Sequence, residues 1–492
     1  MIRLVPGMPL QRSLRAVVVW QSCAAPAIVL RRLADGAVVA SSCVLPALSS
    51  PMAAALTRRG VGVAWLSADG LAADTLYQWE CAGSDAVVVR TLPDAVPREG
   101  LSVLIASCFY GYFPGNGARL VAAAQSVIAR ERPAFRLLIG DNLYVDVAPD
   151  QRRFDDAWEE TAERYAHYLL TKGCGEWYSA LGSATTWDDH EYWNDFPEPQ
   201  SFLSRTWSTA SPSGRGTQHE TYRDAADEAI RVFQQPLNPP GVTPDSRSYT
   251  FDVKPVSFFV ADTRTRRTRA DVAKPALLPE EDLCALEAWA DSLDENRYGV
   301  FVMGQPLWMP AEYREVLDMV VGDHNPPAFR AQYARIVKAL TRAGSDVLVV
   351  SGDVHFSRLA SFAVGNGRRV YELVTSPCCE IPSQKSLGLS ILFDTSLKQD
   401  VLDLEAPKQL PVYSPTAPDW YFGTNASNSF AMLTLTPTAG TLAVNARFVD
   451  ASDPAGRSAA VTEPPGDAVV RRVFNASRCE GDGRPLFTLH SR

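Results

Sequence analysis

Two short apolar runs, far apart in the chain, each lead into a Gly-Asp pair. Residues 137–139 are followed by Gly140-Asp141, and residues 347–350 are followed, after one serine, by Gly352-Asp353. Apolar runs of this length that end at turn residues are typical of buried strands in a parallel sheet. Because α/β proteins bind ligands at the carboxyl ends of such strands, we expect the two aspartates to meet at one edge.

From residue 101 onward, further runs of this kind alternate with helical segments. Apolar residues recur at helical spacing between Leu120 and Ile128, and Pro279 precedes three acids that suit the first turn of a helix. This alternation predicts a layered α/β fold. The other buried strands are expected at residues 103–106, 184–187, 256–261 and 300–303.

Residues 1–97 have a different pattern, which predicts an all-β unit. A hairpin is expected from residues 27–33 and 37–45 around an Asp-Gly turn. Tyr77 follows the expected corner of a sandwich, where a tyrosine hydroxyl bonds to upstream backbone. We therefore predict a small immunoglobulin-like or fibronectin-like β-sandwich at 1–97. The catalytic domain is expected at 98–492, with insertions near 198–220 and 376–428.

Charge and hydropathy exclude several classes of function. The net charge of −9 argues against a stable nucleic-acid partner, because such proteins normally present a basic face. No apolar run approaches the roughly 20 residues that span a bilayer. The run at 16–20 is too short for a secretion signal, so we expect a cytoplasmic protein, with export as the alternative. The nine scattered cysteines contain no CxxC pair, which favours reduced thiols for most of them.

Acidic and imidazole side chains gather at the expected strand ends. Carboxylates bind hard cations and can bridge two of them, whereas imidazole suits iron or zinc. The set therefore predicts a polynuclear metal centre. Hydrolysis at phosphorus is the leading hypothesis, because such a centre activates water and neutralises phosphoryl oxygens. The candidate residues of this metal centre are Asp141, Asp188, Asp189, His190, Asn194, Asp353 and His355.

Two further residues bear on the identity of the metal. Cys108 closes the run 104–108, and Tyr144 stands three residues after Asp141, from where it can fold back as a phenolate. A thiolate and a phenolate together favour ferric iron over magnesium. The alternative interpretation is a buried apolar cysteine and a core tyrosine.

The order of these motifs resembles that of the PhoD-like (alkaline phosphatase D type) metallophosphoesterases. The resemblance spans most of the chain. It rests on Ala106-Ser107-Cys108, on Gly-Asp-x-x-Tyr-x-Asp from position 140, on Trp-Asp-Asp-His-Glu from 187 and on Ser-Gly-Asp-Val-His from 351. It implies a four-layer αββα metallophosphatase sandwich behind a fibronectin-like domain. It also implies hydrolysis of phosphomonoesters and phosphodiesters with Fe³⁺ and Ca²⁺, and other divalent metals stay open.

The resemblance also implies a role for each matching residue. The iron ligands would be Cys108, Asp141, Tyr144 and Asp353, and Asp141 and Asp353 would be shared with calcium, beside Asn194 and His355. Either Asp188 or Asp189 would bind the metal directly, and the other would lie one step away from the metal. His190 resembles a phosphate contact, and Asp189, His190 and His355 are expected to act in catalysis. Arg264, which follows the strand-end Asp262, is expected to bind the substrate phosphate.

Two alternative functions remain open at this point. The first is a catalytically inactive binding or scaffold protein on the same fold, which would predict the loss of ligand residues. The second is a metal-dependent hydrolase that acts on a non-phosphate ester or an amide. On the leading hypothesis the partner is a small phosphate ester. Its preference between monoesters and diesters, and the oligomeric state of the protein, are left open.

Overall fold

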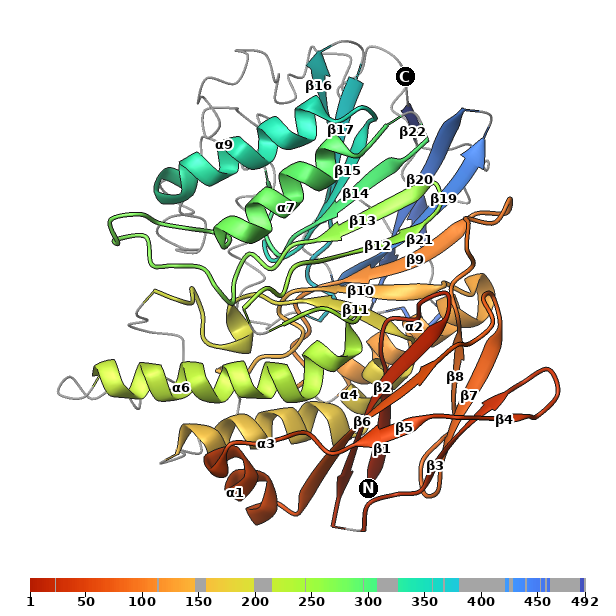
Figure 1. The fold of residues 1–492 in the computed structure, drawn as a ribbon, viewed down its shortest axis with the longest axis vertical. Coiled ribbons are helices and arrows are strands. Elements are labelled where there is room, and N and C mark those ends of the chain that lie inside the picture. Colours follow the sequence, from red (N-terminus) through yellow and green to blue (C-terminus); the bar gives the residue numbers. More distant parts are fainter. Residues whose placement is uncertain are drawn as a thin grey trace.

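The fold is described from a computed structural model (Figure 1). It describes the chain except residues 147–155, 199–214, 308–325, 380–420, 424–427, 461–486 and 491–492. Residues 23, 113–114, 244, 295, 356, 366–367, 439, 452 and 456–457 are also left out. Most of the two predicted insertions, 198–220 and 376–428, lies outside the described residues.

One seven-stranded sheet contains three parallel strands at its first edge. Its order is β11-β10-β9-β19-β20-β21, and β22 also pairs with β20. β10 (Phe135–Ile139) is parallel to both β9 (Leu101–Ala106) and β11 (Ser183–Thr186). β19 continues the sheet antiparallel to β9. The remaining strands are β19 (Ser429–Thr438), β20 (Thr441–Asp450), β21 (Ser458–Ala460) and β22 (Phe487–His490).

A second seven-stranded sheet has four parallel strands at its centre. The parallel strands are β13 (Val256–Val260), β14 (Tyr298–Val302), β15 (Val347–Ser351) and β17 (Arg368–Val374). Antiparallel strands flank them: β12 (Tyr249–Val253) on one side, and β16 (Arg358–Gly365) and β18 (Tyr421–Gly423) on the other. β13, β14 and β15 are buried along their whole length, as expected for apolar strands covered on both faces.

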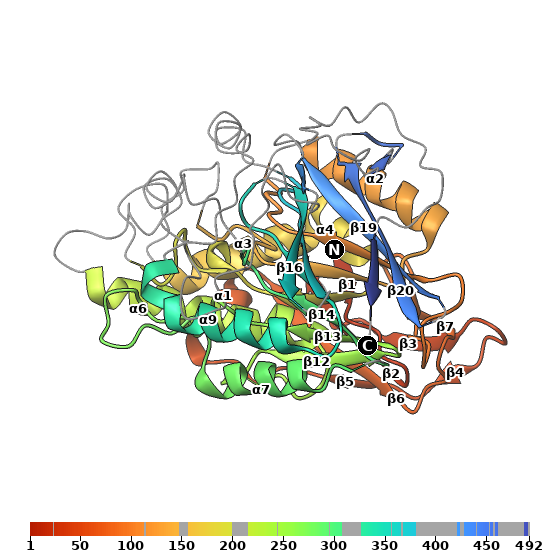
Figure 2. The same cartoon turned by 90° about the horizontal axis from the view of Figure 1, so that it is seen from above.

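Three apolar cores hold these elements together. One core lies between the two large sheets and takes residues from β9, β10, β13, β14 and β15. A second packs α2 (Asn116–Glu131), α3 (Ala157–Leu170) and α4 (Cys174–Ser179) against the first sheet. A third packs α7 (Glu280–Asp291) and α9 (Pro326–Arg342) against the second sheet, where they lie side by side (Figure 2). α6 (Arg215–Ala229) continues into η2 (Ile230–Gln234) and η3 (Gln235–Leu237).

Most elements expected from apolar spacing are confirmed. The expected strands at 103–106, 137–139, 184–187, 256–261, 300–303 and 347–350 correspond to β9, β10, β11, β13, β14 and β15. The helical spacing from Leu120 belongs to α2, and α7 begins directly after Pro279. The largest differences are of a few residues at strand ends, where backbone hydrogen bonds rather than apolar side chains decide the boundary.

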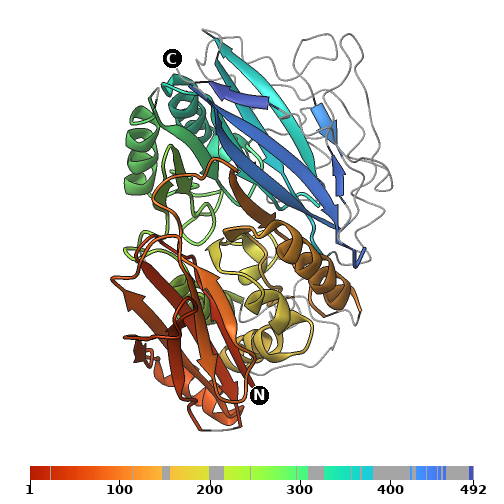
Figure 3. The same ribbon diagram turned by 90° about the vertical axis from the view of Figure 1, so that its right-hand side faces the viewer.

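The N-terminal strands form two four-stranded sheets at one end of the molecule (Figure 3). The orders are β1-β2-β6-β5 and β4-β3-β7-β8, with a core of apolar residues between them. As expected, the hydroxyl of Tyr77 bonds to upstream backbone, accepting from the amide of Ala72 at 3.0 Å. The strands are β1 (Ile2–Pro6), β2 (Ser13–Gln21), β3 (Ile28–Arg32), β4 (Val38–Val39), β5 (Ser42–Val44), β6 (Val61–Asp69), β7 (Leu76–Cys81) and β8 (Val87–Arg90).

Two expectations for this unit were wrong in detail. The segment is not all-β, because α1 (Ser50–Arg58) interrupts it; Ser49 accepts from the amide of Met52 as an N-cap, and alanines fill the helix. The expected hairpin divides, because β4 pairs with β3 whereas β5 pairs with β6 in the other sheet. A single alternating run therefore supplied strands to both sheets.

Two observations concern the environment of the chain. No helix among the described residues is long and apolar enough to cross a membrane. Within the same part of the chain, seven cysteines have free thiols. They are Cys43, Cys81, Cys108, Cys174, Cys284, Cys378 and Cys379.

Replacing Met52 by Ala should lower the free energy of unfolding by about 2–5 kcal/mol, because it leaves a cavity in the core. Met52 on α1 is fully buried in the core that also holds α2, α3 and α4. Thr57→Ala on the exposed face of the same helix is the control and should change stability by less than about 0.5 kcal/mol. Denaturant unfolding measures both. Equal stability of the two variants would contradict the docking of α1.

Candidate metal centre

Strand ends from both large sheets bring candidate ligands to one place. Cys108, Asp141 and Asp188 follow β9, β10 and β11 of the first sheet, whereas Asp353 follows β15 of the second. The sheets approach closely here, since a Cβ added at Gly352 would lie 2.5 Å from the hydroxyl of the serine before Cys108. Glycine at this position therefore lets the two sheets meet, and the aspartate after it enters the shared space.

Four candidate ligands have left-handed backbone conformations. The angle φ is 55° at Cys108, 50° at Asp141, 66° at Asp353 and 55° at His355. Side chains rarely tolerate this region, at a cost of about 1–3 kcal/mol each, and such residues concentrate at functional sites. In the described chain, only four other non-glycine residues have positive φ. The strain thus marks the place where the strand ends converge.

Cys108, Asp141 and His355 form a first group able to hold a metal ion. Their ligand atoms lie within 4.8 Å of one another. Tyr144 points to the same place, because its hydroxyl donates to Oδ2 of Asp141 at 3.3 Å, and Sγ of Cys108 lies 3.4 Å from that oxygen. A thiol and a phenol thus both contact one buried carboxyl oxygen of Asp141.

Burial raises the pKa of all three acidic groups at this point. Desolvation is the largest cause for Cys108, Asp141 and Tyr144, and neighbouring negative charges raise each pKa further, although the charge of His190 opposes this at Asp141. The protein alone therefore favours their protonated forms. A cation among them would reverse this preference, because thiol and carboxyl groups bind metals as anions.

Asp141 also belongs to a second group, with Asp189 and His190. Oδ2 of Asp189 accepts from the amide of Asp195 at 2.6 Å, and Oδ1 of Asp141 accepts from the amide of His190 at 3.3 Å. Asp189 and His190 lie on η1 (Asp189–Glu191), shortly after the end of β11, whereas Asp141 follows β10. Because Asp141 is common to both groups, the arrangement fits two neighbouring cations that share one carboxylate.

The two histidines of the site differ in charge. Burial lowers the pKa of His190, but the carboxylates of Asp146, Asp189 and Asp141 outweigh burial and raise its pKa overall. Its Nδ1 lies 2.8 Å from Oδ1 of Asp146, and its ring packs at 4.1 Å from that of Tyr144. For His355, burial and the charge of His190 lower the pKa to about 3, which leaves a neutral imidazole suited to metal binding.

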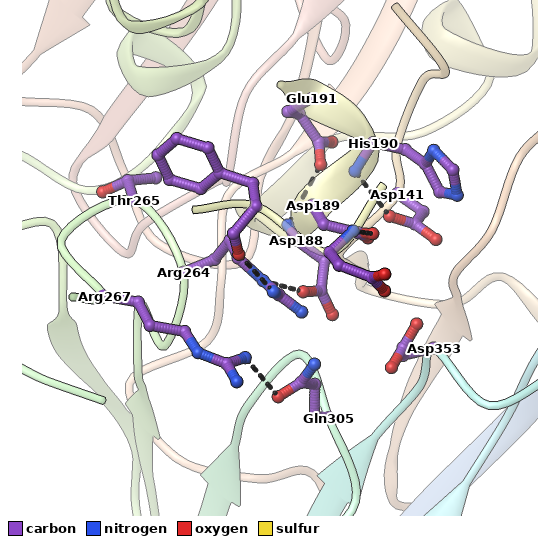
Figure 4. A network of polar contacts seen from close by, with 12 residues as sticks. Asp141, Asp188, Asp189, His190, Glu191, Arg264, Thr265, Arg267, Gln305 and Asp353 are labelled. Atoms are coloured by element: carbon purple, nitrogen blue, oxygen red, sulfur yellow. Dashed lines mark hydrogen bonds and ion pairs between the residues drawn. The ribbon is translucent and has the colours of Figure 1, made fainter. Parts of the chain in front are cut away.

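The adjacent acids Asp188 and Asp189 have different surroundings. Asp188 is in neither ligand group among the described residues; its Oδ1 accepts from Nε of Arg264, and both side chains are fully buried. Nη1 of Arg264 also donates to the carbonyl of Phe196 at 2.6 Å. Arg264, which the sequence predicted to bind substrate, is therefore paired with Asp188 in the structure (Figure 4).

Asp353 and Asn194, two other predicted ligands, lie beside this arrangement. Asp353 is nearly buried, and in Figure 4 its carboxylate lies on the same side of the polar network as Asp141 and Asp189. It belongs to neither of the two ligand groups of the described chain. The backbone amide of Asn194 donates to Oδ2 of Asp146 at 2.8 Å, which places this residue next to the loop after β10.

Two buried acids of the site received no role from the sequence. Asp146 contacts the ring of His190 and the amide of Asn194. Glu191 accepts from the amide of Asn142 through one oxygen and from the amide of Asp188 through the other. Both residues are part of the motifs quoted above. Their spacing showed that they are near the site but not what they contact.

Comparison with known proteins supports the fold. No family model matches the chain. Among curated proteins there is no significant sequence match either. Among solved structures, the chain is similar to a structure of PhoD, with a TM-score of 0.61 and 16% sequence identity over 95% of this chain and 93% of the other. The chain therefore has a PhoD-like fold, as the order of its motifs predicts.

Replacing Arg264 by Gln should destabilise the protein by about 3–5 kcal/mol, because it leaves the carboxylate of Asp188 buried without its cation. The control is Arg266→Gln at a nearby position. The side chain of Arg266 is 34% exposed and its ion pair with Asp227 is long, at 3.9 Å, so its loss should cost no more than about 1 kcal/mol. Unfolding with chelator present measures both. Normal stability combined with a raised KM would instead support a substrate contact by Arg264.

Proposed function

We propose that the protein is a metal-dependent hydrolase of phosphate esters. The observation that carries this proposal is the convergence of Cys108, Tyr144 and Asp141 in a buried place, next to a second ligand group that shares Asp141. Buried acids without a cation are costly, and a metal ion is the usual compensation. The PhoD-like fold supports phosphorus as the reacting centre. The proposal also includes a four-layer αββα arrangement for the catalytic domain and a fibronectin-like fold for residues 1–97.

The donor set fits two different cations. Cys108, Tyr144 and Asp141 supply a thiolate, a phenolate and a carboxylate, which suit ferric iron better than magnesium or calcium. We assign Asp353 to the same ion. Asp141 and Asp353 would also face calcium, together with Asp189 and Asn194, which offer oxygen donors. His355 lies in the group of Cys108, so we place it beside iron. We favour Asp189 over Asp188 as the direct ligand, because Arg264 already compensates the charge of Asp188.

The residues around the ions have distinct roles in this proposal. Bound metal ions would supply an activated water and positive charge beside the phosphoryl oxygens. His190 lies against the carboxylate of Asp146, which stabilises a protonated ring, so it can give a proton to the leaving oxygen. Asp146, at 2.8 Å from Nδ1, orients the ring so that the other nitrogen is available. The substrate is a small phosphate ester, either a monoester or a diester.

The purified protein should hydrolyse p-nitrophenyl phosphate or its diester, bis-p-nitrophenyl phosphate, and chelation should abolish turnover. Asp353→Ala should reduce turnover by at least about 100-fold and lower the metal content, because it removes a ligand from both ions. The matched control is Asp346→Ala. Asp346 is a buried acid at the opposite end of β15 whose carboxylate accepts from the amide of Arg369. Chelator-resistant turnover, or full activity of Asp353→Ala, would refute the metal-dependent mechanism.

The leaving group can test the role of His190. A general acid matters most when the leaving oxygen is basic, so His190→Asn should slow an alkyl phosphate by about 10²–10⁴-fold and p-nitrophenyl phosphate much less. Asp146→Asn should show the same selectivity to a smaller degree, since it disturbs the orientation of the ring. Rates of both substrates at saturation are compared. Equal losses for the two substrates would make His190 a phosphate contact rather than an acid.

A further inference from the structure

One buried carboxylate ties together the two loops that carry the shared ligands. Glu191 is fully buried, with Oε1 accepting from the amide of Asn142 at 2.7 Å and Oε2 accepting from the amide of Asp188 at 3.0 Å. Asn142 directly follows Asp141 on the loop after β10, and Asp188 directly precedes Asp189 on the loop after β11. Each oxygen of one side chain is thus bonded next to a different candidate ligand.

This side chain meets a specific mechanical need at Asp141. The left-handed backbone at Asp141 is strained, so the following peptide needs a partner that holds it in place. That peptide contributes the amide of Asn142, and Glu191 is its acceptor. Other bonds join the same two loops, because the side-chain amide of Asn142 donates to Thr186 at 2.8 Å and Val145 donates to the carbonyl of His190 at 2.9 Å. The amide of His190 also donates to Oδ1 of Asp141 at 3.3 Å. Of these contacts, the Glu191 carboxylate bonds both the peptide that follows Asp141 and the amide of Asp188, the residue before Asp189.

We propose that Glu191 is a positioning residue that sets the separation of Asp141 and Asp189 before a cation binds. The inference rests on the proposed metal centre, but it concerns how the protein builds that centre rather than what the centre does. Glu191 itself touches no ion in this proposal, because both of its oxygens already accept backbone amides. Partners of this kind, one step away from the metal, typically change metal affinity or activity by 10–100-fold when they are replaced.

The chemistry of the side chain explains why glutamate is required. Glutamine has one carbonyl oxygen and an NH₂ group that can only donate, so it can serve only one of the two amides. Aspartate keeps both oxygens but is one methylene shorter, so it cannot reach both loops. Glu191→Gln and Glu191→Asp should therefore loosen the same ligands by two different routes. A purely structural residue would lower stability without a specific effect on the metal.

The test is metal retention by the full-length protein, read as metal content rather than activity. Wild type and both Glu191 variants are dialysed against increasing chelator, and the concentration that removes half of the bound metal is determined. We expect this concentration to fall by about 10–100-fold in both variants. The matched control is Glu160→Gln. Glu160 is a buried acid on α3 that pairs with Arg164 at 3.3 Å, and its loss should lower the melting temperature while metal retention stays at the wild-type value.

The outcomes separate the inference from the proposed function. Wild-type metal retention in both Glu191 variants would overturn the positioning role and leave the metal centre intact. A loss of metal in Glu160→Gln equal to that in the Glu191 variants would also overturn it, since general destabilisation would then explain the effect. A wild-type protein that binds neither iron nor calcium would overturn the metal centre itself, and the inference with it.

Discussion

The structure depends on one electrostatic constraint, the burial of several acidic groups around Asp141. Water is the normal stabiliser of a carboxylate, and removing it costs several kcal/mol per charge unless another partner replaces it. Cys108 and Tyr144 increase the difficulty, since burial raises the pKa of each and the charge of Asp141 raises both further. Without a cation these groups favour their neutral forms, and a cation bound among them would stabilise the anions instead. The proposal that the site binds metal rests on this desolvation together with the two groups of candidate ligands that share Asp141.

The fold makes such a cluster attainable by building it from rigid parts. β10 and β15 are fully buried strands in different sheets, packed on the core between them, so their ends are fixed relative to each other. Gly140 extends this principle, because its φ is 89° and an added Cβ would lie 2.7 Å from Cβ of Asp188. The loops can therefore approach until ligands from three strand ends share one space. Holding a side chain at a rigid strand end requires less ordering of loops than holding it on a flexible segment, which suits a preorganised centre.

The residues that could be predicted from the sequence are those marked by their immediate neighbours in the chain. A strand, a glycine and an acid form a signal within a few neighbouring positions, so Asp141 and Asp353 could be identified before the fold was known. Asp146, Glu191 and Arg264 depend instead on which loop lies opposite, and one sequence does not contain that information. The same limit explains the N-terminal errors, because α1 is stabilised by a core shared with distant helices. Most residues of the two predicted insertions, 198–220 and 376–428, lie outside the described part of the chain.

The pair Asp188-Asp189 shows how the site limits its own charge. Both acids follow β11. In the proposed metal centre, four carboxylates around the ions would bind cations tightly but repel a phosphate ester. Arg264 neutralises Asp188 on one side of the network, while Asp189 remains with Asp141 and His190 on the other (Figure 4). Asp146 is in turn engaged by His190 and the amide of Asn194. On the proposed function, dividing the acids in this way would keep enough negative charge to hold metal ions and leave the ions enough positive charge to attract an anionic substrate.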